Sequence, residues 1–555
     1  MEGRALNVAA TALWRGLPAD SALHGVPFVR GATTQADALF VLDAQLGAAH
    51  LDADNLPDAQ GCLERAMQHL EGGGRAAAAR RRETSHFLRN QLGILWARRD
   101  RHELAREHLE QAAALYEQRG EAVADGEAYG AEAAEGLYAH TAFYLAQSYG
   151  ALGRDQEAAQ MCGETLTRQL TAAAAASSDG GLATLDARDW CANAAQLAGA
   201  FAGLGDLRAA EHCVLAAEAV WQTCRPDVGG DGEAGPDAGG RDSELSANLA
   251  LARGKLHSAR LERAAAARGG EAGGAQAEAG SQSQDGALPL GGVRGVTLPA
   301  PRLAVVATLA AGTYAQGCAE FRDAQRAFRA AMDFYVLDGF VTDHGNVLKA
   351  LSQAHAALAD FLLAGAHDPA SADDDAQRFC RIHRRRSRLL EPVLEQLHPS
   401  HFAALWQELH FELAETAATM LDIKQARQRP YKSVARLLAR AEKHYGRFLD
   451  GFRVPMPDGD MPERVPEESE ESYLSVRFAL ARLLQRAHRG GKDGSGIEPL
   501  VRSLREQEGI MTYLQRNGLH TTPQFAPMHE AAREFVELLP SKIRMASFNF
   551  KANQR

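Results

Sequence analysis

Two stretches of the sequence begin like the zinc-binding helix of a metalloprotease, in which two histidines one turn apart hold the metal. These stretches are HELAR at residues 102–106 and HEAAR at residues 529–533. Zinc binding on such a helix needs the second histidine, but each stretch has an arginine there, and an arginine repels a cation. We therefore interpret both stretches as ordinary surface residues of helices.

Other combinations that could support catalysis are missing from the sequence or have a simpler structural explanation. No GxxxxGK[ST] phosphate-binding loop and no GxSxG nucleophile turn occurs. The glycines of residues 229–240 lie in acidic sequence with no strand before them. His398 and His401 flank a Pro-Ser pair that is typical of a helix start, and no acidic or thiol ligand is near them in sequence. We expect no catalytic residue, no metal site and no cofactor, and hence no enzyme.

The most basic stretch of the chain is RIHRRRSR, which begins at Arg381. On a helix, four of its arginines share one face, namely Arg381, Arg384, Arg385 and Arg388. This face can pair with carboxylates of neighbouring helices or bind an external anion. We favour the internal pairing, because stacked helices commonly join through such contacts.

The composition favours helices as the elements that carry these residues. The chain has 555 residues, too many for one compact core, and only 20 of them are proline. Hydrophobic residues make up 46% and aromatic residues 6%, with alanine dominating many segments, which favours an all-α protein over a β-sandwich or barrel.

We interpret the acidic runs 373–375 and 467–471 as solvated loop charge; attraction of a basic partner is the alternative.

Charge and hydropathy disfavour several classes of partner. The formal net charge of −11 argues against nucleic acid, since phosphate binding needs a basic excess. No apolar run is long enough to cross a bilayer, so we expect no membrane span and a soluble chain. The N-terminal residues do not have the pattern of a secretory signal, and the seven widely spaced cysteines suit reduced thiols in the cytosol.

Helical hairpins repeat along the first part of the chain. In the clearest copy, residues 86–117, Gly93 and Ala105 are small enough for two antiparallel helices to approach closely, and Leu92 and Leu109 fill the space beside them. The same spacing recurs, with one weaker copy, around the anchors Leu46, Leu92, Leu145 and Leu197. This pattern is typical of tetratricopeptide (TPR) repeats, which stack into a right-handed α-solenoid.

Two glycine-rich segments divide the chain into two helical lobes. We predict a partly ordered N-terminal tail at residues 1–35, a TPR lobe at 36–222, a linker at 223–300 with one helix near 245–267 between disordered Gly-rich segments, and a C-terminal helical lobe of degenerate TPR repeats at 301–555. The first degenerate repeat uses Gly312, Ala324, Phe328 and Ala331. Long helices follow near residues 340–363, 376–397, 400–426, 430–452, 472–488, 496–516 and 525–547.

Repeat arrays of this kind bind partners on the concave surface that is lined by the first helix of each repeat. Positions between the apolar ones face that surface, and they are the partner-binding candidates of this chain. They are Asn90, Tyr144, Gln147, Asn193 and Gln196, with Gln169, late in a second helix, at the border. An alternative stays open for each of them, because Tyr144 can pack in the core and the amides can join neighbouring helices.

Several stretches together resemble the KIF-binding protein (kinesin-binding protein) family. In the first lobe they are NQLGILW at residues 90–96, YLAQ at 144–147 and RQL at 168–170. In the second lobe they are LDGFVTDH at residues 337–344, CRIHRRR at 380–386, LEP at 390–392 and LLPSK at 538–542. The TPR part is common to many proteins, whereas the DGFVTDH block is specific. The Gly-rich insert at 264–296 departs from the family's pattern.

The resemblance implies a protein without enzymatic activity that inhibits certain kinesins. In this family the TPR groove holds the motor domain on the surface that otherwise meets the microtubule, and its members affect axonal transport and microtubule organisation. Tyr144, Gln147 and Gln169 match groove positions of the family, while Gln196 stands where the family has a threonine.

The expected partner is therefore a kinesin motor domain, bound by a cytoplasmic, cytoskeleton-associated chain that is monomeric when free. The negative charge agrees with this partner, because a motor surface that binds acidic tubulin must be basic. A generic TPR adaptor, which would bind a linear peptide of another protein, is the alternative.

Overall fold

The computed structural model describes residues 35–71, 82–118, 131–176, 182–224, 238–269, 288–291, 297–302, 304–365, 372–429, 431–453, 462–487 and 497–554. Every regular element within these ranges is a helix, so the predicted all-α fold is confirmed. The chain divides into two compact units, one of Met1–Glu233 with Asp285–Arg302 and one of Ala234–Gln284 with Leu303–Arg555.

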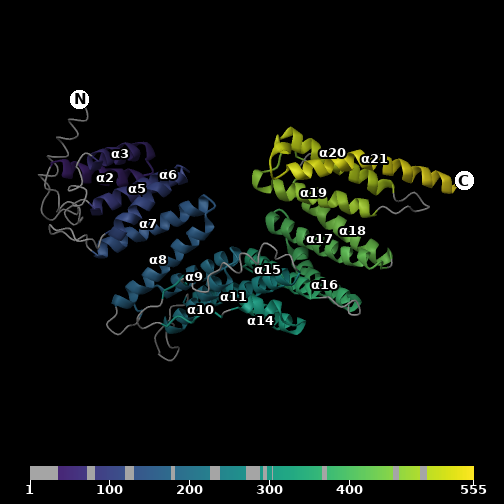
Figure 1. Ribbon diagram of the computed structural model, residues 1–555, viewed down its shortest axis with the longest axis horizontal. Helices are drawn as coiled ribbons and strands as arrows, with labels where there is room; N and C mark the ends of the chain where they lie inside the picture. The colour runs from purple at the N-terminus through teal and green to yellow at the C-terminus, as the bar shows by residue number, and fades with distance from the viewer. Residues whose placement is uncertain are drawn as a thin grey trace. The chain divides into compact units, whose positions relative to one another are not determined.

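Helices of the first unit pack in chain order, mostly against the helix before and the helix after (Figure 1). They are α2 (Gln35–Asp52), α3 (Leu56–Glu71), α5 (Arg82–Arg98), α6 (His102–Glu117), α7 (Ala131–Ala151), α8 (Asp155–Ala176), α9 (Ala187–Gly203) and α10 (Leu207–Cys224). In addition, α5 contacts both α2 and α7. Contacts between near neighbours in sequence are the hallmark of stacked helical repeats.

The close approach within these hairpins depends on a small residue that faces a large one. A Cβ atom on Gly93 would come within 2.5 Å of Leu109, and one on Gly47 within 2.6 Å of Leu63. Both leucines are fully buried, which confirms the packing expected for the clearest hairpin. Gly205, with a φ of 82°, makes the turn between α9 and α10 in a conformation that other residues adopt with strain.

Helices of the second unit also pack largely in chain order. They are α11 (Ala238–Arg268), α13 (Val305–Ala310), α14 (Tyr314–Phe334), α15 (Val341–Ala364), α16 (Ala372–Gln396), α17 (Ala403–Ala426), α18 (Tyr431–Asp450), α19 (Glu467–Ala487), α20 (Ile497–Arg516), the 3-10 turn η5 (Leu519–Thr521) and α21 (Ala526–Gln554). One large apolar core, which includes Phe328, Phe361 and Tyr473, runs through most of them.

The helix predicted inside the linker is part of this core. α11 packs against α14 and α15, and its Leu261 is fully buried. A Cβ atom on Gly254 would come within 2.7 Å of the Phe328 ring on α14, which is the same small-to-large contact that joins the hairpins of the first unit. In the degenerate repeat that was predicted with Gly312 in its first helix, α11 is therefore the helix that pairs with α14, and Gly254 is the small residue that faces Phe328. The Gly-rich segment is an insertion between two paired helices.

A short part of the predicted linker belongs to the first unit. The Gly291 amide donates to the Thr167 hydroxyl at 3.0 Å, and Arg302 pairs with the buried Glu211 at 3.0 Å. The predicted N-terminal tail lies outside the described residues apart from Gln35, and so does most of the Gly-rich sequence.

The two acidic runs expected in loops lie instead in the first turns of helices. Residues 373–375 are in α16 and residues 467–471 are in α19. A helix start stabilises carboxylates because its unpaired N–H groups carry partial positive charge. Glu470 is only 3% exposed and accepts the Tyr513 hydroxyl at 3.1 Å, so this carboxylate is structural.

Among the described residues, α15 alone is long and apolar enough to cross a membrane. Its most apolar window is 67% buried inside the protein. Burial against the other helices of the second unit accounts for its hydropathy, as in the central helix of any helical core.

Candidate partner-binding site

The six candidate residues lie on four helices of the first unit. They are Asn90 on α5, Tyr144 and Gln147 on α7, Gln169 on α8, and Asn193 and Gln196 on α9. The glutamines and Asn193 are exposed, Tyr144 is half-buried, and Asn90 is buried. The six residues therefore do not form one surface.

Asn90 belongs to the interface between α5 and α7. Its side chain is 1% exposed, and its Nδ2 donates to the Leu137 carbonyl at 2.9 Å. Its Oδ1 accepts the Thr141 hydroxyl at 2.8 Å, and that hydroxyl lies 2.7 Å from His86 Nε2. Burial lowers the pKa of His86 to about 4, so the ring is neutral. Because the threonine hydroxyl gives its one proton to Asn90, Nε2 is the donor to that hydroxyl. Asn90 therefore joins α5 to α7, and it is not part of the candidate binding surface.

Tyr144 lies at a junction between two apolar clusters. Its ring packs against the cluster that contains Leu92 and against the one that contains Leu109 and Leu145. Phe143 makes an edge-to-face contact with it, with 5.1 Å between the ring centroids. Tyr144 thus has a packing role and an accessible edge at once.

Three of the four exposed candidates lie on two open helix faces, and the fourth, Gln169, lies on α8. On α7, Gln147 follows the exposed Phe143 by one turn, and on α9, Asn193 and Gln196 are also one turn apart. Among the described residues, no hydrogen bond occupies these amides. A Cβ atom on Gly150 would meet nothing within 4 Å, so this end of the α7 face is uncovered.

Phe143 is the surface residue that the repeat pattern missed. It is 53% exposed, although large apolar side chains are usually buried. The signal that would have found it is its place one turn before Gln147, on the same face of the helix. An exposed apolar ring beside an uncovered amide is a common composition for a protein contact.

A cluster of rings and charges around Arg168 fixes the backbone beside Gln169. The guanidinium of Arg168 lies 4.2 Å from the ring centroid of Tyr138 and pairs with Glu164 at 2.8 Å and with Glu135 at 3.1 Å. Burial raises the pKa of Tyr138, and the Glu164 carboxylate raises it further, so the phenol keeps its proton and donates to Glu164 at 3.0 Å. This cluster joins α7 to α8 and holds Gln169 at a fixed place on the surface.

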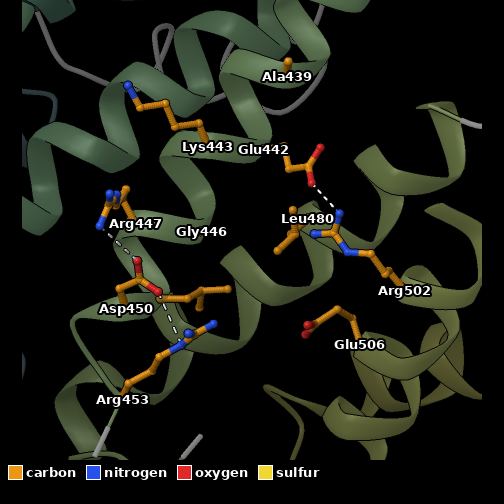
Figure 2. A pocket seen from close by; sticks show the side chains of 11 residues that line it. Ala439, Glu442, Lys443, Gly446, Arg447, Asp450, Arg453, Leu480, Arg502 and Glu506 are labelled. Carbon is orange, nitrogen blue, oxygen red and sulfur yellow. Dashed lines mark hydrogen bonds and ion pairs between the residues drawn. The ribbon is translucent and has the colours of Figure 1, made fainter. Parts of the chain in front are cut away.

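The second unit contains a charged hollow of about 470 Å³ between α18, α19 and α20 (Figure 2). Glu442 on α18 pairs with Arg502 on α20 at 2.6 Å. Asp450 pairs with Arg447 at 3.6 Å and with Arg453 at 3.3 Å. A general base needs a carboxylate that is free to take a proton, and these carboxylates already bind arginines. The wall thus holds Glu442 and Asp450 in ion pairs.

Burial makes two of the cysteines unreactive. Burial raises the pKa of Cys191 and of Cys213 to about 12, which suppresses the nucleophilic thiolate. Arg106 in the HELAR stretch pairs with Glu103 at 2.9 Å and with Glu110 at 2.8 Å, which confirms a surface helix there. Within the described ranges, no group of three histidine, cysteine or acidic side chains is placed to hold a metal ion.

Several known proteins are similar to this sequence. A family model described as KIF-1 binding protein C terminal matches residues 188–545. The KIF-binding protein of Danio rerio is 27% identical, over 92% of this chain and 83% of its own length. The KIF-binding protein of Homo sapiens is 26% identical, over 95% of this chain and 86% of its own length. The KIF-binding protein of Dictyostelium discoideum is 24% identical over 42% of this chain and 37% of its own length. Since the family model spans more than half of the chain, this protein belongs to the KIF-binding protein family.

Proposed function

We propose that this chain binds kinesin motor domains and keeps them from attaching to microtubules. The proposal rests on family membership, since the relatives carry the name KIF-binding protein. The observation that supports it best is the uncovered face of α7, where the Gln147 amide and the exposed Phe143 ring lie one turn apart without a role in the core. The proposed contact residues are Phe143, Tyr144, Gln147, Gln169, Asn193 and Gln196.

Charge supports this partner. The chain carries a formal net charge of −11, and a motor surface that binds an acidic filament is itself basic. Long-range attraction would speed the encounter, while the neutral amides and Phe143 make the contact without burying unpaired charge. The chain then acts by competition for the filament-binding surface, without catalysis, in the cytoplasm beside the microtubules.

Microtubule co-sedimentation of a purified kinesin motor domain tests the proposal. With this chain at saturation, the motor should leave the microtubule pellet, and the effect should weaken as salt rises. A pellet that keeps all its motor would contradict the inhibition. A pellet that holds the motor together with this chain would show binding without inhibition.

Two glutamines provide the sharpest variants. Gln147→Ala and Gln169→Ala should each weaken motor binding about three- to tenfold, because each removes a hydrogen-bonding side chain from the contact. Gln160→Ala is the matched control, since Gln160 is exposed on α8 nine residues before Gln169, which places it on the opposite face of the helix. Equal weakening by all three substitutions would contradict the assigned surface.

The peptide-adaptor alternative makes a different prediction. A short linear peptide from the partner would then displace the intact motor domain completely. Partial or absent displacement favours recognition of a folded surface.

A further inference from the structure

A second hollow in the second unit has a wall of one charge only. It has a volume of about 320 Å³ and lies where α16 and the end of α17 meet the start of α18. It is lined by Ala376, Gln377, Cys380, Arg381, Arg384, Ile423, Lys424, Arg427, Arg429 and Ser433. Five of these side chains are cations and none is a carboxylate. The hollow of Figure 2, by contrast, mixes both signs.

Most of these cations have no acidic partner. Arg429 pairs with Asp373, whose carboxylate also attracts Arg427 from a longer distance. Arg381 Nε donates weakly to the Gln377 carbonyl at 3.4 Å. For Arg384, Lys424 and Arg427, no carboxylate lies within ion-pair distance in the part of the chain that the structure describes. The internal pairing expected for the face of Arg381 and Arg384 is therefore not found in these residues.

Arg386, on the same helix, shows how the protein treats an arginine that it uses for structure. Arg386 is 7% exposed and pairs with Glu412 at 2.8 Å, while its Nε donates to the Ser352 hydroxyl at 3.0 Å. The basic run therefore serves two purposes. Arg386 joins α16 to its neighbours, and Arg381 and Arg384, on another side of the helix, line the open hollow.

The unpaired cations repel one another at close range. Burial lowers the pKa of Lys424. The Cys380 thiol opposes this effect, while the nearby Arg384, Arg436 and Arg429 lower the pKa further. Repulsion of this kind destabilises the empty site, and an anion in the hollow would relieve it.

We propose that this hollow binds a small compound that carries two or more phosphate groups. Guanidinium groups hold phosphate oxygens through paired, charge-assisted hydrogen bonds, and a lysine adds a compact point charge. The volume is at the lower end of the range for small-ligand pockets, about 300–1,000 Å³, and suits a diphosphate better than a peptide segment. The compound can be free in solution or be the headgroup of a phosphoinositide lipid, since both present the same chemistry.

Calorimetric titration of the full chain with sodium diphosphate tests the site. Diphosphate should bind more tightly than sulfate at equal ionic strength. Arg384→Gln and Lys424→Gln should each weaken binding about tenfold, because each removes a charged donor. Arg388→Gln is the matched control, since Arg388 is exposed on the same helix but does not line the hollow. Absent binding, or equal binding by all variants, would overturn the proposal.

Thermal melting separates a lost site from a lost fold. Without anion, Arg384→Gln and Lys424→Gln should melt at or above the temperature of the wild type, because each relieves repulsion. Diphosphate should raise the melting temperature of the wild type and of Arg388→Gln only. Variants that melt early and still respond to diphosphate would overturn the proposal.

Vesicles distinguish the two sources of the ligand. Binding to vesicles that contain phosphatidylinositol bisphosphate, lost in Arg384→Gln and absent with phosphatidylserine at equal charge, would assign the site to the lipid headgroup. Diphosphate binding without vesicle binding would assign it to a free compound. Vesicle binding that survives Arg384→Gln together with absent diphosphate binding would overturn the site.

Discussion

The buried chain of hydrogen bonds from His86 through Thr141 to Asn90 makes Asn90 a stability residue. Asn90→Ala removes the amide that binds the Leu137 carbonyl and leaves a gap between α5 and α7. We expect a loss of about 1–3 kcal/mol in the free energy of unfolding, since a buried group loses its partner. Urea denaturation measures it. Gln147→Ala, at an exposed position, should change stability by less than about 0.5 kcal/mol, and equal effects would contradict this assignment.

Repeat position alone could not separate Asn90 from the exposed candidates. Asn90 stands two residues before the anchor Leu92, and Phe143 stands two residues before the anchor Leu145, yet one is buried and the other is 53% exposed. The cause is the neighbouring helix. α7 covers that side of α5, whereas the matching side of α7 is open. Helical spacing shows which residues share a face, and only the packing of the next helix shows whether that face is covered.

Gly254 carries the pairing of α11 with α14, and its substitution tests that pairing. Gly254→Ala places a methyl group within 2.7 Å of the Phe328 ring. We expect a loss of about 1–3 kcal/mol from overpacking, partly recovered when Phe328→Leu makes room. Gly446→Ala in α18 is the control, because its Cβ would meet nothing within 4 Å. That change should be neutral or stabilising by up to about 1 kcal/mol. Equal losses in thermal or urea melting would contradict the pairing.

Helices of the second unit were predictable where apolar periodicity is unbroken. The range predicted near 496–516 is found as Ile497–Arg516, and the range near 340–363 as Val341–Ala364. α16 and α19 begin four to five residues earlier than their apolar pattern, because their first turns are acidic. An apolar pattern marks only the turns that face the core. The acidic first turn has no such pattern, but the interaction of its carboxylates with the helix dipole stabilises it, so each helix begins earlier.

At the scale of the whole chain, the composition located the Gly-rich segments, but it did not show which paired helices they separate. The Gly-rich sequence after α11 marks an insertion between the two members of a helical pair. The clue was Gly254, which has the small side chain that the first helix of a pair needs opposite a large residue such as Phe328. With a usual hairpin, the two positions would lie 16 residues apart, as Gly93 and Leu109 do.

Buried neutral histidines should make the protein sensitive to acid. Burial lowers the pKa of His86, His355 and His410 to about 4 and of His383 and His444 to about 3. An unfolded histidine takes up its proton near pH 6.5. Between pH 6.5 and about 4 the unfolded chain therefore binds more protons than the folded chain. The stabilisation that these neutral histidines contribute is fully present above pH 6.5. As the pH drops below that value, the free energy of unfolding falls by up to about 1.4 kcal/mol per pH unit for each histidine.

The buried pair of His410 and His444 allows the effect to be isolated. Their Nδ1 atoms lie 2.8 Å apart, so one neutral ring donates to the other, and their ring centroids are 5.0 Å apart. Replacing both by leucine should flatten the fall in unfolding free energy between pH 6.5 and 5, by up to about 3 kcal/mol per pH unit. His398 and His401 form an exposed pair with the same 5.0 Å between centroids, and their replacement by leucine should leave the slope unchanged. Urea denaturation across this pH range measures both slopes, and identical slopes for the two double variants would show that burial of the first pair does not drive the acid sensitivity.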